Sequence, residues 1–214
     1  MKAVITGATG GLAQATAEAL RGAGMEVSSP DREELDVSSP ESVSRYFAAA
    51  GEVDLLVCNA GLIIDEPLAR MSEQDWDRVL AVNLKGAFLC AREVVRSMCK
   101  RRGGHIIFIS SFSALHPPAG QVNYAAAKSA LLGVTKSMAQ ELGGRNVRVN
   151  CILPGFLETK MTANLPDEVK RSICGRHVLG RFNTPVEVAG FVCHLHQNMP
   201  HTSGQVFNLD SRIA

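Results

Sequence analysis

Short runs of β-branched and other apolar residues alternate along this chain with longer segments in which apolar positions recur at helical spacing. The short runs predict strands at residues 3–5, 26–28, 54–58, 105–109, 147–153 and 205–209. The longer segments predict helices at residues 12–22, 73–82, 86–101, 123–142 and 185–196. Strands that alternate with helices are typical of βαβ units. We therefore expect a doubly wound α/β fold with a mostly parallel sheet, in one domain spanning residues 1–214.

Two stretches depart from this alternation. Between the second strand and Asp36 only residues 28–35 are available, which are too few for a crossover helix. One βαβ unit is therefore trimmed, and the sheet is expected to shorten or lose its third strand. Residues 156–183 show no clear period, and we expect them to be irregular.

The composition excludes some classes of partner. The net charge is +1, with 46% hydrophobic and 20% charged residues, which gives no electrostatic reason to expect nucleic acid or an anionic membrane. No apolar run approaches the roughly 18 residues of a membrane span, and the chain begins directly with a strand, without a signal peptide. The cysteines are scattered without a C-x-x-C pair, as expected of reduced thiols. We expect a cytoplasmic protein.

A glycine-rich turn follows the first strand and opens the first helix. Its candidate binding residues are Thr6, Gly7, Thr9, Gly10, Gly11 and Leu12. Glycines let a backbone approach a pyrophosphate, and a helix N-terminus offers oriented N–H groups; a plain tight turn is the alternative.

An acidic residue follows this turn at the spacing of a ribose ligand. Asp31 lies 24 residues after Gly7, near the offset at which an acidic residue binds the adenosine ribose of a dinucleotide. The next residue, Arg32, is positioned to pair with a 2′-phosphate instead, unless both are solvated loop charges. The pattern predicts a Rossmann-type site for NAD(H) or NADP(H). NAD(H) is favoured, because a carboxylate repels a phosphate.

Tyr124 and Lys128 are four residues apart in a predicted helix and therefore share one helix face. An ammonium close to a phenol lowers the phenol's pKa from its usual value of about 10. Ser111 lies thirteen residues before Tyr124, just after a predicted strand, and Ser110 is the competing serine. A Tyr-x-x-x-Lys pair alone is usually a surface pair. Together with a hydroxyl and a dinucleotide turn, it indicates a site of hydride transfer.

In their order and spacing, these motifs resemble the short-chain dehydrogenase/reductase family over nearly the whole chain. The motifs are Thr6-Gly7-x-x-x-Gly11, Asp36, Asn59-Ala60-Gly61, Asn83, Ser111, Tyr124-x-x-x-Lys128 and Pro154-Gly155 with Thr159. The resemblance implies that Tyr124 gives a proton to a carbonyl oxygen as hydride arrives from the nicotinamide, or accepts it in reverse. It implies that Lys128 binds the nicotinamide ribose and favours tyrosinate, and that Ser111 hydrogen-bonds the substrate. Asn83 would kink a helix and hold a water that relays protons to Lys128.

The resemblance also assigns the remaining cofactor contacts. Asn59, Ala60 and Gly61 would lie near the ribose, and Asp36 and Val37 near the adenine. The contacts to the nicotinamide carboxamide would come from Pro154, Gly155, Leu157 and Thr159. The stretch 156–183 would close over the substrate and exclude water, as lids do.

Within the family, residues 121–128, 154–161 and 179–182 are similar to 3-oxoacyl-[acyl-carrier-protein] reductases. In that group two arginines at the mouth of the site bind the acidic carrier, and Arg102 and Arg145 occupy the matching positions. The resemblance implies a small carbonyl or alcohol substrate, free or linked to a carrier protein or CoA, and a homotetramer or homodimer. The trimmed region and the C-terminal tail, which lacks the usual Gly-Gly, depart from the group.

Two other functions stay open. An NAD-dependent secondary-alcohol or hydroxyacyl dehydrogenase would use the same residues towards oxidation. A nucleotide-sensing binding protein on a retired enzyme fold is the alternative of another class. No metal is expected from His194, His196 and His201, because positions i and i+2 do not share a helix face. His116 either faces the substrate or lies in a surface loop.

Overall fold

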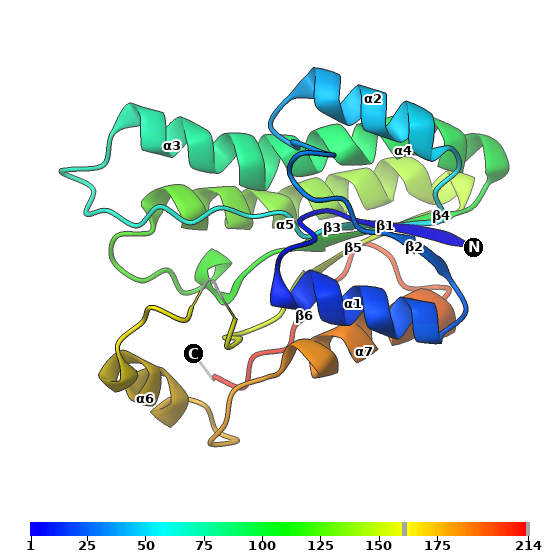
Figure 1. The fold of residues 1–214 in the computed structure, drawn as a ribbon. Coiled ribbons are helices and arrows are strands. Elements are labelled where there is room, and N and C mark those ends of the chain that lie inside the picture. Colours follow the sequence, from blue (N-terminus) through cyan, green and yellow to red (C-terminus); the bar gives the residue numbers. More distant parts are fainter. Residues whose placement is uncertain (160–161, 213–214) are drawn as a thin grey trace.

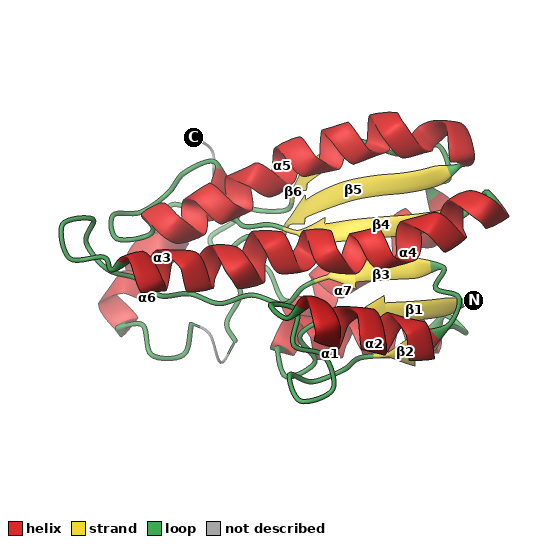
Figure 2. Cartoon of the chain, turned by 90° about the horizontal axis from the view of Figure 1, so that it is seen from above, coloured by secondary structure: helices red, strands yellow, loops and turns green. Residues whose placement is uncertain are grey.

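The computed structural model describes residues 1–159 and 162–212, which form a parallel sheet between two layers of helices (Figure 1, Figure 2). Within these residues the sheet has the order β2-β1-β3-β4-β5-β6. The strands are β1 Lys2–Ile5, β2 Glu26–Ser28, β3 Leu55–Cys58, β4 Gly104–Ile109, β5 Val147–Leu153 and β6 Val206–Asn208. The strand order reverses at β1, because β2 and β3 lie on opposite sides of it. In such sheets ligands bind outside the carboxyl ends of the strands at the reversal.

Helices cover both faces of the sheet, which confirms the doubly wound α/β fold. The helices are α1 Gly11–Gly22, α2 Pro40–Ala50, α3 Glu73–Leu80, α4 Ala87–Arg101, α5 Val122–Leu142, α6 Asp167–Gly175 and α7 Pro185–Asn198. One face is covered by α1 and α7, which pack against each other, and the other by α2, α4 and α5 (Figure 1). None of the described helices is long and apolar enough to span a membrane.

Strand β1 shows how the pattern of side chains divides the core. Ala3 and Ile5 point to one face and pack in a buried cluster with Leu20 of α1, whereas Val4 points to the other face and joins a cluster with Leu131 of α5. This alternation follows from the two-residue repeat of a strand. Full burial of side chains of this size contributes about 2 kcal/mol each. Both layers of helices are thereby anchored to the strand that leads into the glycine turn.

The trimmed region is confirmed, but the crossover that follows it was not predicted. In the described part of the chain no strand lies between β2 and Asp36. The connection to β3 runs through α2, whose start is signalled by Ser39, because its side chain accepts a hydrogen bond from the Ser42 N–H at 3.1 Å. Pro40 in the first turn also favours a helix start. Similarly, α6 lies inside residues 156–183, so that stretch is not irregular throughout.

One of the histidines considered as metal ligands, His196, packs against another histidine, His105. His105 of β4 stacks on His196 of α7 with ring centroids 5.6 Å apart, and its Nε2 lies 3.0 Å from Asn150 Nδ2. Burial lowers the pKa of His196 to about 4 and holds that of His105 well below its usual value, so both rings are neutral at pH 7. Over residues 1–159 and 162–212, no three His, Cys, Asp or Glu side chains are grouped to hold a metal ion.

Candidate active site

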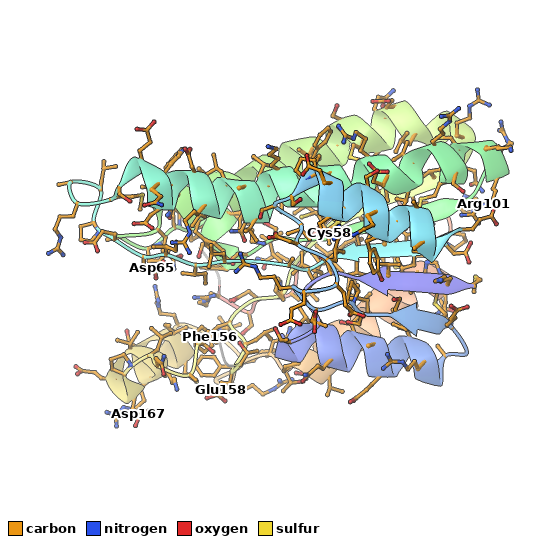
Figure 3. All side chains as sticks on the ribbon, turned by 45° about the horizontal axis from the view of Figure 1, so that its top comes forward. Cys58, Asp65, Arg101, Phe156, Glu158 and Asp167 are labelled. Atoms are coloured by element: carbon orange, nitrogen blue, oxygen red, sulfur yellow. The ribbon has the colours of Figure 1, made fainter. Side chains whose placement is uncertain are left out.

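A cavity of about 1540 Å³ lies at the carboxyl ends of the strands, beside the reversal in strand order. Of the predicted site residues, it is lined by Gly7, Thr9, Gly10, Gly11, Leu12, Asp31, Arg32, Asp36, Val37, Asn59, Ala60, Gly61, Ser111, Tyr124, Lys128, Pro154, Gly155, Leu157 and Thr159. Thr6 and Asn83 are buried behind its wall. Asp65 and Phe156, which also line it, lie at the end of the molecule opposite to Arg101 (Figure 3). The fold thus collects residues that are far apart in the sequence.

The glycine turn brings the β1–α1 connection against the turn after β3. Gly7 has φ +80°, and a Cβ there would lie 2.9 Å from Ala60 Cα, so only glycine suits the position. Thr6 joins the two turns, because its Oγ1 accepts the N–H groups of Asn59 and Ala60, each at 3.0 Å. Helix α1 begins at Gly11 with no side-chain cap among the described residues, which leaves its first N–H groups open to an anion. The turn therefore fits a dinucleotide pyrophosphate.

Gly7→Ala is expected to weaken NAD(P)H binding about tenfold or more and to lower the free energy of unfolding by about 1–3 kcal/mol. The added methyl group would meet the Ala60 backbone and would force a positive φ on a residue that carries a Cβ. Cofactor titration and thermal unfolding measure the two effects. Gly22→Ala is the control, because nothing lies within 4 Å of its Cβ position. Equal effects of the two substitutions would contradict this account of the turn.

In the turn after β2, the side chain of Asp31 accepts hydrogen bonds from the backbone of the same turn. Asp31 Oδ1 accepts the backbone N–H groups of Glu33 and Glu34 at 2.8 and 3.1 Å, which stabilises the turn. Arg32 is exposed, and its Nη2 lies 3.8 Å from Asp36 Oδ2. Because Asp31 and Arg32 both line the cavity, the side chains that would recognise a ribose hydroxyl or a 2′-phosphate are adjacent.

Asp36 and Val37 are held in place by close neighbours. Asp36 Oδ1 accepts both the N–H and the hydroxyl of Ser38, at 2.9 and 2.6 Å. The Ser38 hydroxyl is the main reason that the pKa of Asp36 is lowered, so the carboxylate is ionised at neutral pH. Val37 packs closely on Gly86, where a Cβ would lie 2.8 Å from Val37 Cγ2. A glycine at position 86 is therefore required for this approach.

Tyr124 and Lys128 lie one turn apart on α5, with Lys128 Nζ 5.6 Å from the centre of the Tyr124 ring. Both side chains are buried in the cavity wall. The Ser111 hydroxyl is close enough to that of Tyr124 to affect its pKa, whereas the buried Ser110 hydroxyl donates to the Lys128 carbonyl oxygen at 2.8 Å. The Lys128 ammonium donates to the Ile109 carbonyl oxygen at 2.9 Å. The structure therefore brings Ser111, Tyr124 and Lys128 together and gives Ser110 a structural contact.

The protonation of this pair differs from the expectation based on sequence. Burial raises the pKa of Tyr124 to about 12, although the Ser111 hydroxyl opposes the shift. Burial also lowers the pKa of Lys128 to about 8. The expectation that the ammonium brings the phenol to titrate near neutrality is wrong for the protein alone, because desolvation is the largest effect on the pKa of each group. The phenol therefore keeps its proton at neutral pH.

Asn83 lies in a π-helical segment, Ala81–Gly86, that joins α3 to α4. Its Nδ2 donates to the carbonyl oxygens of Leu62 and Val79 at 2.8 and 2.9 Å. A Cβ on Gly61 would lie 3.1 Å from Asn83 Oδ1 and 3.8 Å from Lys128 Nζ. Asn83 and Lys128 thus both lie close to Gly61, and Asn83 Oδ1 is already used as the acceptor of the Leu62 N–H, at 3.3 Å.

Comparison with known proteins places this site in a family. The profile described as short chain dehydrogenase matches residues 1–170. The chain belongs to the short-chain dehydrogenase/reductase family. A 3-oxoacyl-[acyl-carrier-protein] reductase of Aquifex aeolicus is 38% identical over 97% of this chain and 94% of its own. Another, of Thermotoga maritima, is 42% identical over 86% of this chain and 73% of its own.

A solved structure shows the same fold. A candidate NAD(P)-dependent gluconate 5-dehydrogenase of Beutenbergia cavernae, crystallised with NADP at low occupancy, has a TM-score of 0.92 and 30% sequence identity. The match covers 98% of this chain and 95% of that one. This short-chain dehydrogenase/reductase is therefore an NAD(P)-dependent oxidoreductase that acts on CH–OH or C=O groups. The expected similarity to 3-oxoacyl-[acyl-carrier-protein] reductases is confirmed by the identities above.

In this family member, residues that the sequence analysis did not assign hold the turn after β5. Gly155 has φ +80°, and a Cβ there would lie 2.8 Å from Asp210 Oδ2. Asn183 Nδ2 donates to the carbonyl oxygens of Pro154 and Leu209, at 3.2 and 3.3 Å. The C-terminal tail and residue 183 therefore fix the segment expected to bind the nicotinamide. The feature of the sequence that pointed to this role of the tail was the absence of the Gly-Gly that the tail usually carries.

Arg102 and Arg145 lie near each other, but at the other end of the sheet from the cavity. Arg102 follows α4, and its Nη2 donates to the Gly144 carbonyl oxygen at 3.2 Å, one residue before Arg145. Both arginines precede strands, β4 and β5, and so lie at the amino ends of the strands. The neighbouring Arg101 marks this end of the molecule (Figure 3). The expectation that the two arginines lie at the mouth of the site is therefore wrong within a single chain.

Proposed function

We propose that this protein uses NAD(P)H to reduce a ketone or a 3-oxoacyl thioester to the secondary alcohol, with Tyr124 as the acid. The observation that carries the proposal is the buried Lys128 ammonium. It donates a hydrogen bond to the Ile109 carbonyl oxygen, and no carboxylate pairs with it among the described residues. A buried cation without a counter-ion is costly, and groups perturbed in this way concentrate at functional sites. Here the cation lies beside a phenol in a cavity wall.

The side chains divide the chemistry between them. When bound, the nicotinamide supplies a hydride from its C4 to the carbonyl carbon of the substrate. Tyr124 gives its hydroxyl proton to the carbonyl oxygen as charge develops there, so that C=O becomes CH–OH. Ser111 hydrogen-bonds the same oxygen and orients it. Lys128 stabilises the tyrosinate that remains, and Asn83, which like Lys128 lies close to Gly61, would hold the water that returns a proton from solvent.

The protonation of Tyr124 in the protein alone suits the reducing direction at neutral pH. Reduction requires the phenol, and the pKa of about 12 keeps the proton in place at neutral pH. Oxidation of an alcohol requires the tyrosinate, which is scarce in the protein alone until the pH is far above neutral. Reduction is therefore favoured over the alternative of a secondary-alcohol or hydroxyacyl dehydrogenase.

NADP(H) is the proposed form of the cofactor, in place of the NAD(H) expected from Asp31. One oxygen of the Asp31 carboxylate, Oδ1, is used by two backbone N–H groups, and the exposed Arg32 offers a guanidinium to a 2′-phosphate. The NADP in the related structure supports this choice. The N-terminus of α1, residues 59–61 and residues 154–159 would hold the rest of the dinucleotide.

Arg32→Gln is expected to raise KM for NADPH about tenfold or more, because a charge-assisted contact to the 2′-phosphate is lost. KM for NADH should change less than about threefold, because NADH lacks that phosphate. Steady-state kinetics with both cofactors measure the difference. If KM for the two cofactors rose equally, Arg32 would not be reading the phosphate.

The family relatives supply the proposal for the substrate. The similarity to 3-oxoacyl-[acyl-carrier-protein] reductases supports a 3-oxoacyl thioester, with a carrier protein or CoA as the proposed partner. The homotetramer or homodimer implied by the family resemblance stays a prediction.

A carbonyl panel tests the proposal. Oxidation of NADPH and of NADH is followed at pH 7 with a series of ketones and with an acetoacetyl thioester, and turnover of at least one carbonyl is expected. Faster turnover of alcohols with the oxidised cofactor would favour the dehydrogenase. Cofactor binding without turnover of any carbonyl or alcohol would favour a nucleotide-sensing protein.

A further inference from the structure

Arg212 lies where the C-terminal tail meets the cavity, against the residue that follows Ser111. Its guanidinium carbon is 3.6 Å from the centre of the Phe112 ring, and the same ring packs with His116 at 4.8 Å between centroids. All three side chains line the cavity. The Arg212 side chain is only 10% exposed. It is therefore a cavity residue and not a mobile surface arginine.

A buried carboxylate, that of Asp210, forms an ion pair with Arg212. Asp210 has no exposed side-chain surface and accepts hydrogen bonds from Arg212 Nε, at 2.8 Å, and from Nη2. Burial opposes the ionisation of Asp210, but the bonds from Arg212 hold its pKa below the usual value. The tail itself is fixed, because Ser211 Oγ lies 3.0 Å from His177 Nδ1 and Asp210 accepts the Phe156 N–H at 3.2 Å. The guanidinium is thus oriented before any ligand binds.

One edge of the guanidinium remains available to a ligand. The contacts to Asp210 use Nε and Nη2, and no acceptor for Nη1 occurs among the described residues. Arg176, at the end of α6, lines the same cavity and is close enough for its charge to affect His177. The Asp210 side chain, in contrast, is fully buried. Of this ion pair, therefore, only the Arg212 guanidinium is accessible from the cavity.

We propose that Arg212 is a specificity-determining residue that binds a carboxylate of the carbonyl substrate. An arginine fork matches the planar geometry of a carboxylate, and stacking on an aromatic ring keeps the guanidinium partly desolvated. The proposal rests on the carbonyl reduction proposed above, takes its ketone branch in place of the 3-oxoacyl thioester, and adds that keto acids are preferred over neutral ketones and esters. If Arg212 only neutralised Asp210, the enzyme would not distinguish substrates by their charge.

The test compares keto acids with their neutral methyl esters. The probes are acetoacetate, 4-oxopentanoate and 5-oxohexanoate, each with its methyl ester, at saturating NADPH. In the wild type, kcat/KM for at least one acid is expected to exceed that for its ester about tenfold or more. The double variant Asp210→Asn/Arg212→Gln keeps a neutral hydrogen-bonding pair and avoids a buried lone carboxylate. It should lower the ratio of kcat/KM for that acid to kcat/KM for its ester about tenfold or more, because any shift of the turn that Asp210 holds acts on both substrates alike.

The control is Arg171→Gln, which removes an exposed arginine of α6 that lies outside the cavity and should change neither substrate. Equal kcat/KM for acids and esters in the wild type, or equal losses for both in the double variant, would overturn the proposal. So would a Kd for NADPH that rises in Arg212→Lys, which keeps Asp210, as much as in the double variant, because that result would place Arg212 on the cofactor. If the double variant fails to fold, Arg212→Lys replaces it. Lysine keeps the positive charge but cannot form the two parallel hydrogen bonds of a guanidinium. An unchanged preference for acids in Arg212→Lys would then count against the proposal.

The failure of this proposal can be told from the failure of the proposed function. If esters and thioesters are reduced and acids are not preferred, only the assignment of Arg212 is wrong. If no acid, ester or thioester is reduced, the carbonyl reduction itself is wrong. In that case calorimetric binding of 4-oxopentanoate in the presence of NADP+ still decides, because the wild type should bind it and the double variant should not.

Discussion

Tyr124→Phe is expected to lower kcat for carbonyl reduction about a thousandfold or more, with the Kd for NADPH changed less than about threefold. The substitution removes the phenol hydroxyl beside Ser111 in the cavity wall, and it keeps the buried ring. Because the ring stays in place, the free energy of unfolding should change by less than about 1 kcal/mol. Single-turnover oxidation of NADPH with the most active ketone, combined with thermal unfolding, separates the loss of chemistry from a loss of fold.

The chain contains a matched control for this substitution. Tyr46 is its other tyrosine, and the Tyr46 hydroxyl also hydrogen-bonds a serine, Ser28, at 2.7 Å. Burial raises the pKa of Tyr46 as well, but it lies on α2, outside the cavity. Tyr46→Phe should therefore leave kcat unchanged. If Tyr124→Phe retained activity within about threefold of the wild type, Tyr124 would not be the acid.

The parts of the fold and site that could be predicted are those set by neighbouring residues. The glycine turn between β1 and α1 lies within one strand–turn–helix unit, so its conformation follows from the local run of glycines. Tyr124 and Lys128 share a helix turn, and the helix period alone places them together. The sheet was predicted because its central strands are short apolar runs, and the loss of the third strand followed from the length of the connection after Ser28.

The parts that could not be predicted depend on residues that are distant in the sequence. Helix α2 buries only Ser42, Val43 and Phe47, so its apolar signal was too sparse to stand out. The contact of Asp210 with Gly155 joins residues 55 apart in sequence, and no local pattern encodes it. The direction of the pKa shift of Tyr124 is set by how deeply α5 is packed, which is a property of the assembled fold.

The same packing makes Lys128 the second residue whose loss should have a large effect. Lys128→Gln is expected to lower kcat/KM for reduction about a hundredfold or more, because the positive charge that stabilises the tyrosinate is removed from a buried site. Glutamine can still donate a hydrogen bond towards the Ile109 carbonyl oxygen, which Lys128 contacts at 2.9 Å. Lys136→Gln is the control, because Lys136 is an exposed lysine on the same helix.

The pH dependence of kcat/KM distinguishes a catalytic role of Lys128 from a structural one. Burial lowers the pKa of Lys128 to about 8, so the ammonium loses its proton above that pH, while Tyr124, with a pKa of about 12, still carries its own. In the wild type, kcat/KM for reduction should therefore be constant at neutral pH and fall as the pH rises through about 8. Lys128→Gln should lack this fall, and Lys136→Gln should retain it. A fall near pH 8 that persists in Lys128→Gln would assign the titration to another group and would remove the ammonium from the mechanism.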